Sequence, residues 1–73
     1  MEKDIKTDFP RRLKKLRLER GYTQQQLAEI SGIDYKHIQK LERRRLQHDI
    51  KLTTIKKLAK AFDISISQLL DDY

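Results

Sequence analysis

The chain has 73 residues, no cysteine and a formal net charge of +6. This length allows one modest hydrophobic core, and the lack of cysteine excludes disulfides and thiol catalysis. The basic balance favours polyanionic partners, with nucleic acid ahead of an anionic membrane surface. No segment reaches the roughly 18 apolar residues of a membrane span, and no signal-peptide pattern opens the chain, so we expect a soluble, cytoplasmic protein.

The excess positive charge is concentrated in one part of the chain. Residues 9–45 carry eleven basic and four acidic side chains, whereas residues 1–8 and 46–73 are close to neutral. The same central part has regularly spaced apolar residues. This combination favours a folded binding face over a disordered basic arm.

The first helix is expected over about residues 9–20, after an N-terminal extension of residues 1–8. Asp8 is suited to cap this helix, and Pro10 fits an early turn, where its missing N–H is harmless. An apolar stripe runs along the helix and stops before Gly21.

The second helix is expected directly after Thr23. Thr23 and Gln26 have the spacing of a capping box, in which the hydroxyl and the amide satisfy each other's backbone N–H groups. Leu27 and Ile30 give this helix an apolar face. Gly32 ends it, since glycine tolerates the positive φ of a tight turn.

The second and third segments have the features of a helix-turn-helix unit. Its steep crossing requires a small residue near the contact and a glycine at the bend, and Ala28 and Gly32 provide both. Asp34 is placed to cap the third helix, expected over about residues 35–43. The residues predicted to face one common core are Leu27, Ile30, Ile38 and Leu41.

Two further helices are expected in the C-terminal part. The fourth covers about residues 52–62 and has the clearest helical periodicity in the chain. Ser65 and Gln68 form a second capping box before a last short helix. We therefore predict an all-α, five-helix domain over residues 9–70, followed by a tail of residues 71–73.

The outward face of the third helix is rich in hydrogen-bond donors. An α-helix fits the major groove of DNA, where Lys can bond guanine, Gln can bond adenine, and Tyr can contact a phosphate or a thymine methyl. Without a motif around it, such a face is more often only a solvated surface, but the helix-turn-helix framework favours a surface that recognises DNA bases. The side chains concerned are Lys36, Gln39, Lys40 and Arg43, with Tyr35 and His37 on the flanks.

Several blocks of the chain, in the same order, resemble the XRE-like helix-turn-helix family, which includes the Cro and phage-repressor proteins. The central block is TQQQLAEISGIDYKHIQKLER, preceded by FPRRL and followed by LAKAFDISISQLL. The resemblance covers about residues 9–70. It implies a five-helix repressor-like fold and a DNA-binding function.

The resemblance also implies roles for particular residues. It implies a phosphate contact at Gln24 and an ion pair between Arg17 and Glu42, and the helical wheel agrees in turning Glu42 inward. Burying this pair costs desolvation, so we expect it to serve orientation more than stability. The matching base-reading residues are Tyr35, Lys36 and Lys40.

The residues after Glu42 depart from the family's pattern. Arg44 and Ile50 stand where a glycine and a proline are common, and the connection to Leu52 is longer than usual. The arginine run at 43–45 either extends the third helix or forms a phosphate-contacting loop.

Together these features predict a sequence-specific regulator of transcription that binds double-stranded DNA. For Gln24 and its neighbours, a purely structural role as capped helix formers is an equally good alternative to a phosphate contact. The predicted base-reading residues are Tyr35, Lys36, Gln39 and Lys40. The predicted phosphate-contacting residues are Thr23, Gln24, His37, Arg43, Arg44 and Arg45.

The C-terminal apolar residues predict a homodimer, because a very small core has little room to cover them all. The alternative is that they simply close the core of the monomer. The residues predicted for the dimer interface are Ile64, Ile66, Leu69, Leu70 and Tyr73.

Other functional classes have weaker support. His37 and His48 lack the further ligands of a zinc site, and no catalytic grouping is evident, so we expect no metal, cofactor, small-molecule effector or enzymatic activity. Three alternatives remain. They are an antitoxin or other module that binds a protein partner such as a toxin, a restriction-modification controller, and a coat protein that binds DNA regardless of sequence.

Overall fold

The computed structural model describes residues 4–70, which form five α-helices and no strand. This is the all-α architecture expected from the sequence. The helices are α1 (Ile5–Glu19), α2 (Gln24–Ser31), α3 (Tyr35–Leu41), α4 (Leu52–Ala61) and α5 (Ile66–Leu70). No helix in the described part of the chain has both the length and the apolar character needed to cross a membrane.

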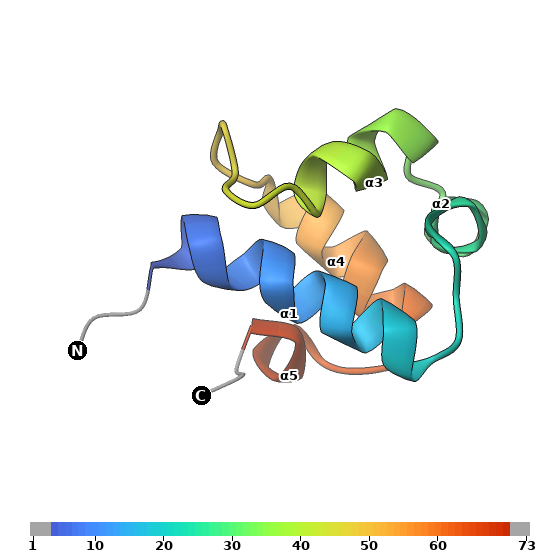
Figure 1. Ribbon diagram of the computed structural model, residues 1–73. Helices are drawn as coiled ribbons and strands as arrows, with labels where there is room; N and C mark the ends of the chain where they lie inside the picture. Colours follow the sequence, from blue (N-terminus) through green and yellow to red (C-terminus); the bar gives the residue numbers. More distant parts are fainter. Residues whose placement is uncertain (1–3, 71–73) are drawn as a thin grey trace.

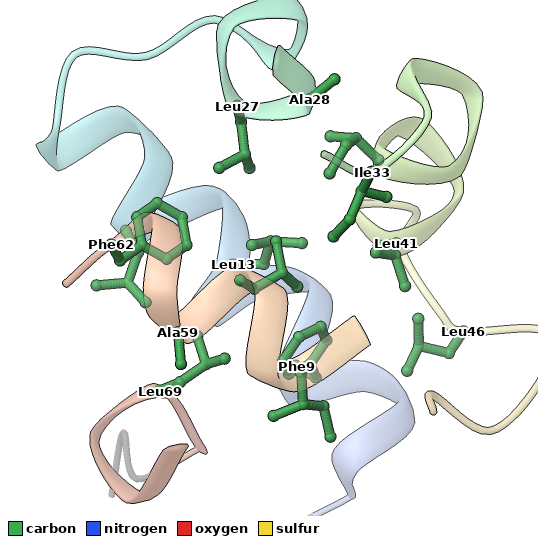
Figure 2. Close-up of a cluster of buried hydrophobic side chains, with 14 residues drawn as sticks. Phe9, Leu13, Leu27, Ala28, Ile33, Leu41, Leu46, Ala59, Phe62 and Leu69 are labelled. Carbon is green, nitrogen blue, oxygen red and sulfur yellow. The ribbon is translucent and has the colours of Figure 1, made fainter. Parts of the chain in front are cut away.

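The helices pack around a single core (Figures 1 and 2). α2 packs on α3 and α4, while α5 packs on α1 and α4. In the view of Figure 1, α3 and α5 lie on opposite sides of the α1 and α4 pair. The largest fully buried side chains are Phe9, Leu13, Leu27, Ile38, Leu58, Phe62 and Leu69.

The first helix begins earlier than the sequence predicted. Asp4, not Asp8, is its N-cap, and the Asp4 side chain accepts a hydrogen bond from the Lys6 N–H at 3.0 Å. Asp8 lies one turn inside the helix, where it accepts the Asp4 N–H at 3.2 Å. Residues 5–8 therefore belong to α1 and not to an extension, and the Asp8 cap was a wrong prediction.

Pro10 consequently lies inside α1 and not in its first turn. A proline in a helix interior leaves the carbonyl four residues before it without its usual N–H partner. That carbonyl belongs to Lys6, and it accepts a hydrogen bond from the Leu46 N–H at 2.8 Å. Because of the proline, the Lys6 carbonyl is available to the Leu46 N–H, and this hydrogen bond attaches the α3–α4 connection to α1.

One apolar assignment in α2 was wrong. Ile30 is 50% exposed, whereas Leu27 and Ala28 are buried. At 100° per residue the buried face is centred between Leu27 and Ala28, which turns Ile30 about 110° away from it. Ile33, in the turn after α2, is buried instead at 6% exposure.

An ion pair reinforces the attachment of the α3–α4 connection to α1. The Arg45 guanidinium lies 2.9 Å from the Asp4 carboxylate. This hydrogen bond, together with the Lys6 N–H, holds the pKa of Asp4 below its ordinary value. Both side chains are about half exposed, so the pair is a weak contributor to stability.

We expect Asp4→Asn to lower the melting temperature slightly at pH 7, because the amide still caps α1 but no longer pairs with Arg45 as an anion. Since the folded-state pKa of Asp4 is lowered, its stabilising effect is present above the ordinary carboxyl pKa and is lost as the pH falls through the lower folded value. Thermal unfolding of variant and parent at successive pH values measures this. The difference in melting temperature should shrink at low pH, and a constant difference would contradict the ionic contribution.

Candidate DNA-binding surface

The α2–turn–α3 unit is defined by caps at both helix starts. The Thr23 hydroxyl accepts the Gln26 N–H at 3.0 Å, and the Gln26 side chain accepts the Thr23 N–H at 2.8 Å, which completes the predicted capping box. Gly32 adopts a φ of 73° at the end of α2, as expected for a left-handed turn residue. The Asp34 carboxylate then accepts the Lys36 N–H at 3.0 Å and starts α3.

The orientation of α3 follows from the residues it buries. Ile38 is fully buried and Leu41 is 4% exposed, so the opposite side of the helix faces outward. Every residue predicted to read bases, and one predicted to contact phosphate, is exposed on α3, with Tyr35 and His37 on the flanks of the outward face. The exposed side chains on α3 are Tyr35, Lys36, His37, Gln39 and Lys40.

The helix is shorter at its C-terminus than expected. It ends at Leu41, with Glu42 as its C-cap, so Arg43 lies beyond the helix and not on its outward face. The predicted extension to residue 43 was therefore wrong. Arg43 and Arg44 are exposed in the connection that follows.

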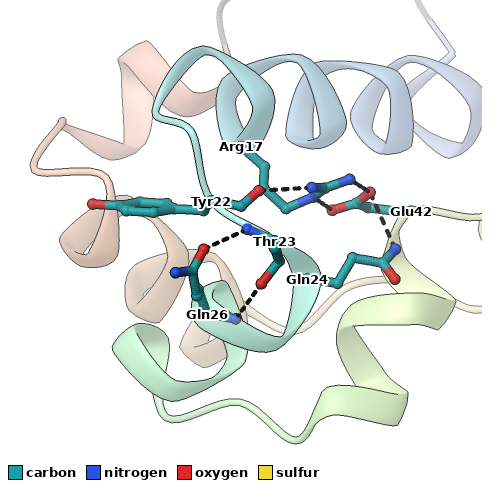
Figure 3. Close-up of polar contacts among 6 residues, drawn as sticks. All are labelled: Arg17, Tyr22, Thr23, Gln24, Gln26 and Glu42. Carbon is teal, nitrogen blue, oxygen red and sulfur yellow. Dashed lines mark hydrogen bonds and ion pairs between the residues drawn. The ribbon is translucent and has the colours of Figure 1, made fainter.

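A buried ion pair joins α1 to the end of α3, as the family resemblance implied (Figure 3). Arg17 Nε lies 2.7 Å from Glu42 Oε2, and Arg17 Nη2 lies 3.0 Å from Glu42 Oε1. The Arg17 and Glu42 side chains are only 10% and 2% exposed. Two parallel bonds of this kind fix the angle between the partners as well as their distance.

The same cluster reaches the start of α2. Arg17 Nη1 donates to the Tyr22 carbonyl at 2.8 Å, and Gln24 Nε2 donates to Glu42 Oε1 at 3.3 Å. These contacts hold the entrance of α2, where Thr23 and Gln24 were predicted to contact phosphate (Figure 3). The Gln24 side chain therefore bonds to the buried ion pair through its amide nitrogen while it remains partly exposed at the start of α2.

The three arginines of the α3–α4 connection lie in different environments. Arg45 pairs with Asp4 at the start of α1, whereas Leu46 beside it is buried at 5% exposure. Arg43 and Arg44 precede this attachment and keep their side chains at the surface. The connection is thus a loop fastened at its middle, and not a continuation of α3.

The predicted dimer residues lie in different environments. Leu69 has no exposed surface and belongs to the core of the chain, so its assignment to an interface was wrong. Ile64, Ile66 and Leu70 are partly buried against that core. Tyr73 lies outside the described residues.

Two contacts of the site carried no clear signal in the sequence. Gln39 Nε2 donates to the Tyr35 hydroxyl at 3.1 Å, and the Gln24 amide bonds to Glu42. The i, i+4 spacing of Tyr35 and Gln39 is the one feature that points to the first contact. Among residues 4–70, no three His, Asp or Glu side chains come together as a group that could hold a metal ion.

Comparison with known proteins identifies the family. The helix-turn-helix family HTH_3 matches residues 13–69, which is most of the chain. The chain belongs to this family. The XRE-like membership expected from the sequence is thereby confirmed, and the protein is a DNA-binding regulator of transcription.

Two solved structures resemble this HTH_3 regulator along most of its length. The restriction-modification controller protein C.AhdI from Aeromonas hydrophila is 38% identical, with a TM-score of 0.78, and the match covers 86% of this chain and 92% of that one. A hypothetical transcription factor, NHTF from Neisseria, is 30% identical with a TM-score of 0.80, covering 92% and 75%. Among curated proteins no match was found.

We expect Glu42→Gln to destabilise the HTH_3 domain by about 3–5 kcal/mol, because it leaves the buried Arg17 charge without a counter-ion. Denaturant unfolding monitored by helical circular dichroism measures this cost. The double variant Arg17→Met, Glu42→Leu should recover most of the loss, since it removes both charges and keeps similar volumes. A cost for Glu42→Gln below about 1 kcal/mol would contradict a role for the pair in holding α3.

Proposed function

We propose that this regulator reads a specific DNA sequence by placing α3 in the major groove, and that it acts in the cytoplasm as a homodimer on an inverted-repeat operator. The observation that carries the proposal is the exposed donor-rich face of α3 on a helix whose other face is locked into the core. In regulators of this type, two-fold symmetric dimers bind half-sites one or more helical turns apart.

Base reading is assigned to four exposed residues of α3. Lys donates to guanine acceptors, Gln matches the donor and acceptor of adenine, and Tyr contacts a thymine methyl or donates a hydrogen bond. None of the four is buried, so each is accessible to a base edge. They are Tyr35, Lys36, Gln39 and Lys40.

Phosphate contacts are assigned to residues on both sides of α3. Such contacts set the register on the duplex but carry no sequence information of their own. Arg45 is already bonded to Asp4 through Nη1, so we assign it mainly to holding the connection. The phosphate-contacting residues we propose are Thr23, Gln24, His37, Arg43 and Arg44.

A homodimer interface is proposed at the C-terminal end of the chain. Ile64, Ile66 and Leu70 keep part of their apolar surface exposed there. In Figure 1, α5 lies on the far side of α1 and α4 from α3, so pairing through α5 leaves the reading face free. This placement supports a dimer in which both copies of α3 remain available to DNA.

The two assigned roles predict different effects of single substitutions. Lys36→Ala should cost about 1–3 kcal/mol of binding free energy on the preferred site and relax its specificity, because it removes a base contact. Arg44→Ala should weaken binding to all sequences similarly and reduce its salt dependence. Titrations on the preferred duplex and on random duplexes measure both, and equal losses on the two for Lys36→Ala would overturn its assignment.

The dimer assignment predicts that Ile66→Glu shifts the protein to monomer and weakens binding to the full inverted repeat more than to an isolated half-site. The reason is that a carboxylate in an apolar interface must be desolvated without a partner. Sedimentation equilibrium gives the oligomeric state, and circular dichroism checks that the helices are retained. A folded variant that still dimerises would place the interface elsewhere.

Selection of bound duplexes from a random DNA pool tests the proposed function as a whole. The ionic strength should be near ~0.15 M, where non-specific electrostatic binding is weakened. Enrichment of an inverted repeat is the expected result. Recovery of unrelated sequences would overturn sequence-specific regulation and favour a coat protein or a module that binds a protein partner such as a toxin.

A second, more specific candidate function is control of a restriction-modification system. It is favoured by the 38% identity to C.AhdI over most of both chains. The selected operator distinguishes this candidate. Its occurrence upstream of methyltransferase and endonuclease genes would support a controller, and its occurrence beside unrelated genes would oppose one.

A further inference from the structure

We propose that Tyr35 is a positioning residue that orients the Gln39 amide, so that Gln39 reads adenine in preference to guanine. The inference rests on the proposed function, which places α3 in the major groove. It goes further in assigning one exposed pair a joint role in base selectivity. The observation behind it is the hydrogen bond from Gln39 Nε2 to the Tyr35 hydroxyl at 3.1 Å.

The two side chains lie one turn apart on the exposed side of α3. Tyr35 is the first residue of the helix, directly after the Asp34 cap, and Gln39 follows at i+4. Residues with this spacing lie on the same side of a helix. Tyr35 also borders a shallow hollow lined by Thr23 and Gln24 at the start of α2.

The hydrogen bond changes what the Gln39 amide can offer to a base. A free glutamine amide has two N–H donors and an oxygen acceptor. With one N–H directed to Tyr35, the remaining outward edge consists of one N–H and the Oε1 acceptor. In the structure the hydroxyl is the acceptor of this bond, which holds the amide nitrogen, and not Oε1, toward Tyr35.

This edge complements adenine better than guanine. In the major groove adenine presents the N7 acceptor and the N6 amino donor, which match one N–H and one oxygen. Guanine presents two acceptors, N7 and O6, so the Gln39 oxygen would face an acceptor without a proton between them. An amide released from Tyr35 can rotate and offer N–H to guanine, which would weaken the discrimination.

The test compares Tyr35→Phe, Gln39→Ala and the double variant on duplexes that differ by single A·T to G·C changes in the selected operator. Tyr35→Phe keeps the ring and removes only the hydroxyl. We expect it to reduce the preference for adenine at the Gln39-dependent position about threefold to tenfold, the factor for one net hydrogen bond. Gln39→Ala should abolish the preference, and adding Tyr35→Phe to it should change nothing more at that position.

A measurement on the free wild-type protein does not depend on how the variants fold. The Gln39 side-chain amide protons should show nuclear Overhauser contacts to the Tyr35 ring protons. Absence of these contacts would overturn the proposed pairing. Circular dichroism of Tyr35→Phe confirms that its helices are unchanged before binding is compared.

The outcomes separate this inference from the proposed function. A wild-type protein without any sequence preference overturns the proposed function itself. A wild type with a preference that Gln39→Ala alters and Tyr35→Phe does not overturns the positioning role alone. Equal weakening of all duplexes by Tyr35→Phe, with a smaller salt dependence, would also overturn it, since that result marks a phosphate contact.

Discussion

The buried ion pair between Arg17 and Glu42 is the interaction on which the placement of α3, the proposed DNA-reading helix, depends. It joins α1 to the residue that ends α3, and its members also bond the Tyr22 carbonyl and the Gln24 amide at the entrance of α2. The desolvation of two charges makes such a pair a poor source of net stability compared with apolar side chains of similar volume. Its directional bonds instead set three helices at defined angles, which is what base reading requires.

A backbone contact complements this ion pair at the other end of α1. Pro10 has no N–H for the Lys6 carbonyl, and the Leu46 N–H takes that place at 2.8 Å. Burial of Leu46 and the Arg45–Asp4 pair hold the same point of the connection. The α3–α4 connection is thereby fixed at its middle, so that the exposed arginines at 43 and 44 project from an anchored segment.

The sequence predicted the fold and the exposed face of α3 because both depend on local chemistry. Capping residues and the glycine at 32 act within a few residues, and helical spacing alone turned the donors of α3 outward. The wrong predictions concern residues whose burial or helix position depends on contacts with other parts of the chain. Ile30 fits an apolar stripe but faces solvent, and Leu69 fits an interface but completes the core. The earlier start of α1 is linked to Asp4, whose ion-pair partner lies 41 residues away.

The brevity of α3 couples recognition to the core. Its seven residues are fewer than the about 12 that an isolated helix needs to be even marginally stable in water, so its helical form depends on the Asp34 cap, on Ile38 and Leu41, and on Glu42. Removing one of these supports should lower DNA binding through loss of the folded state and leave base preference unchanged. The exposed residues behave in the opposite way, because they contribute little to the core. Comparing the free energy of unfolding with base preference across variants therefore separates the residues that hold α3 from those proposed to read DNA.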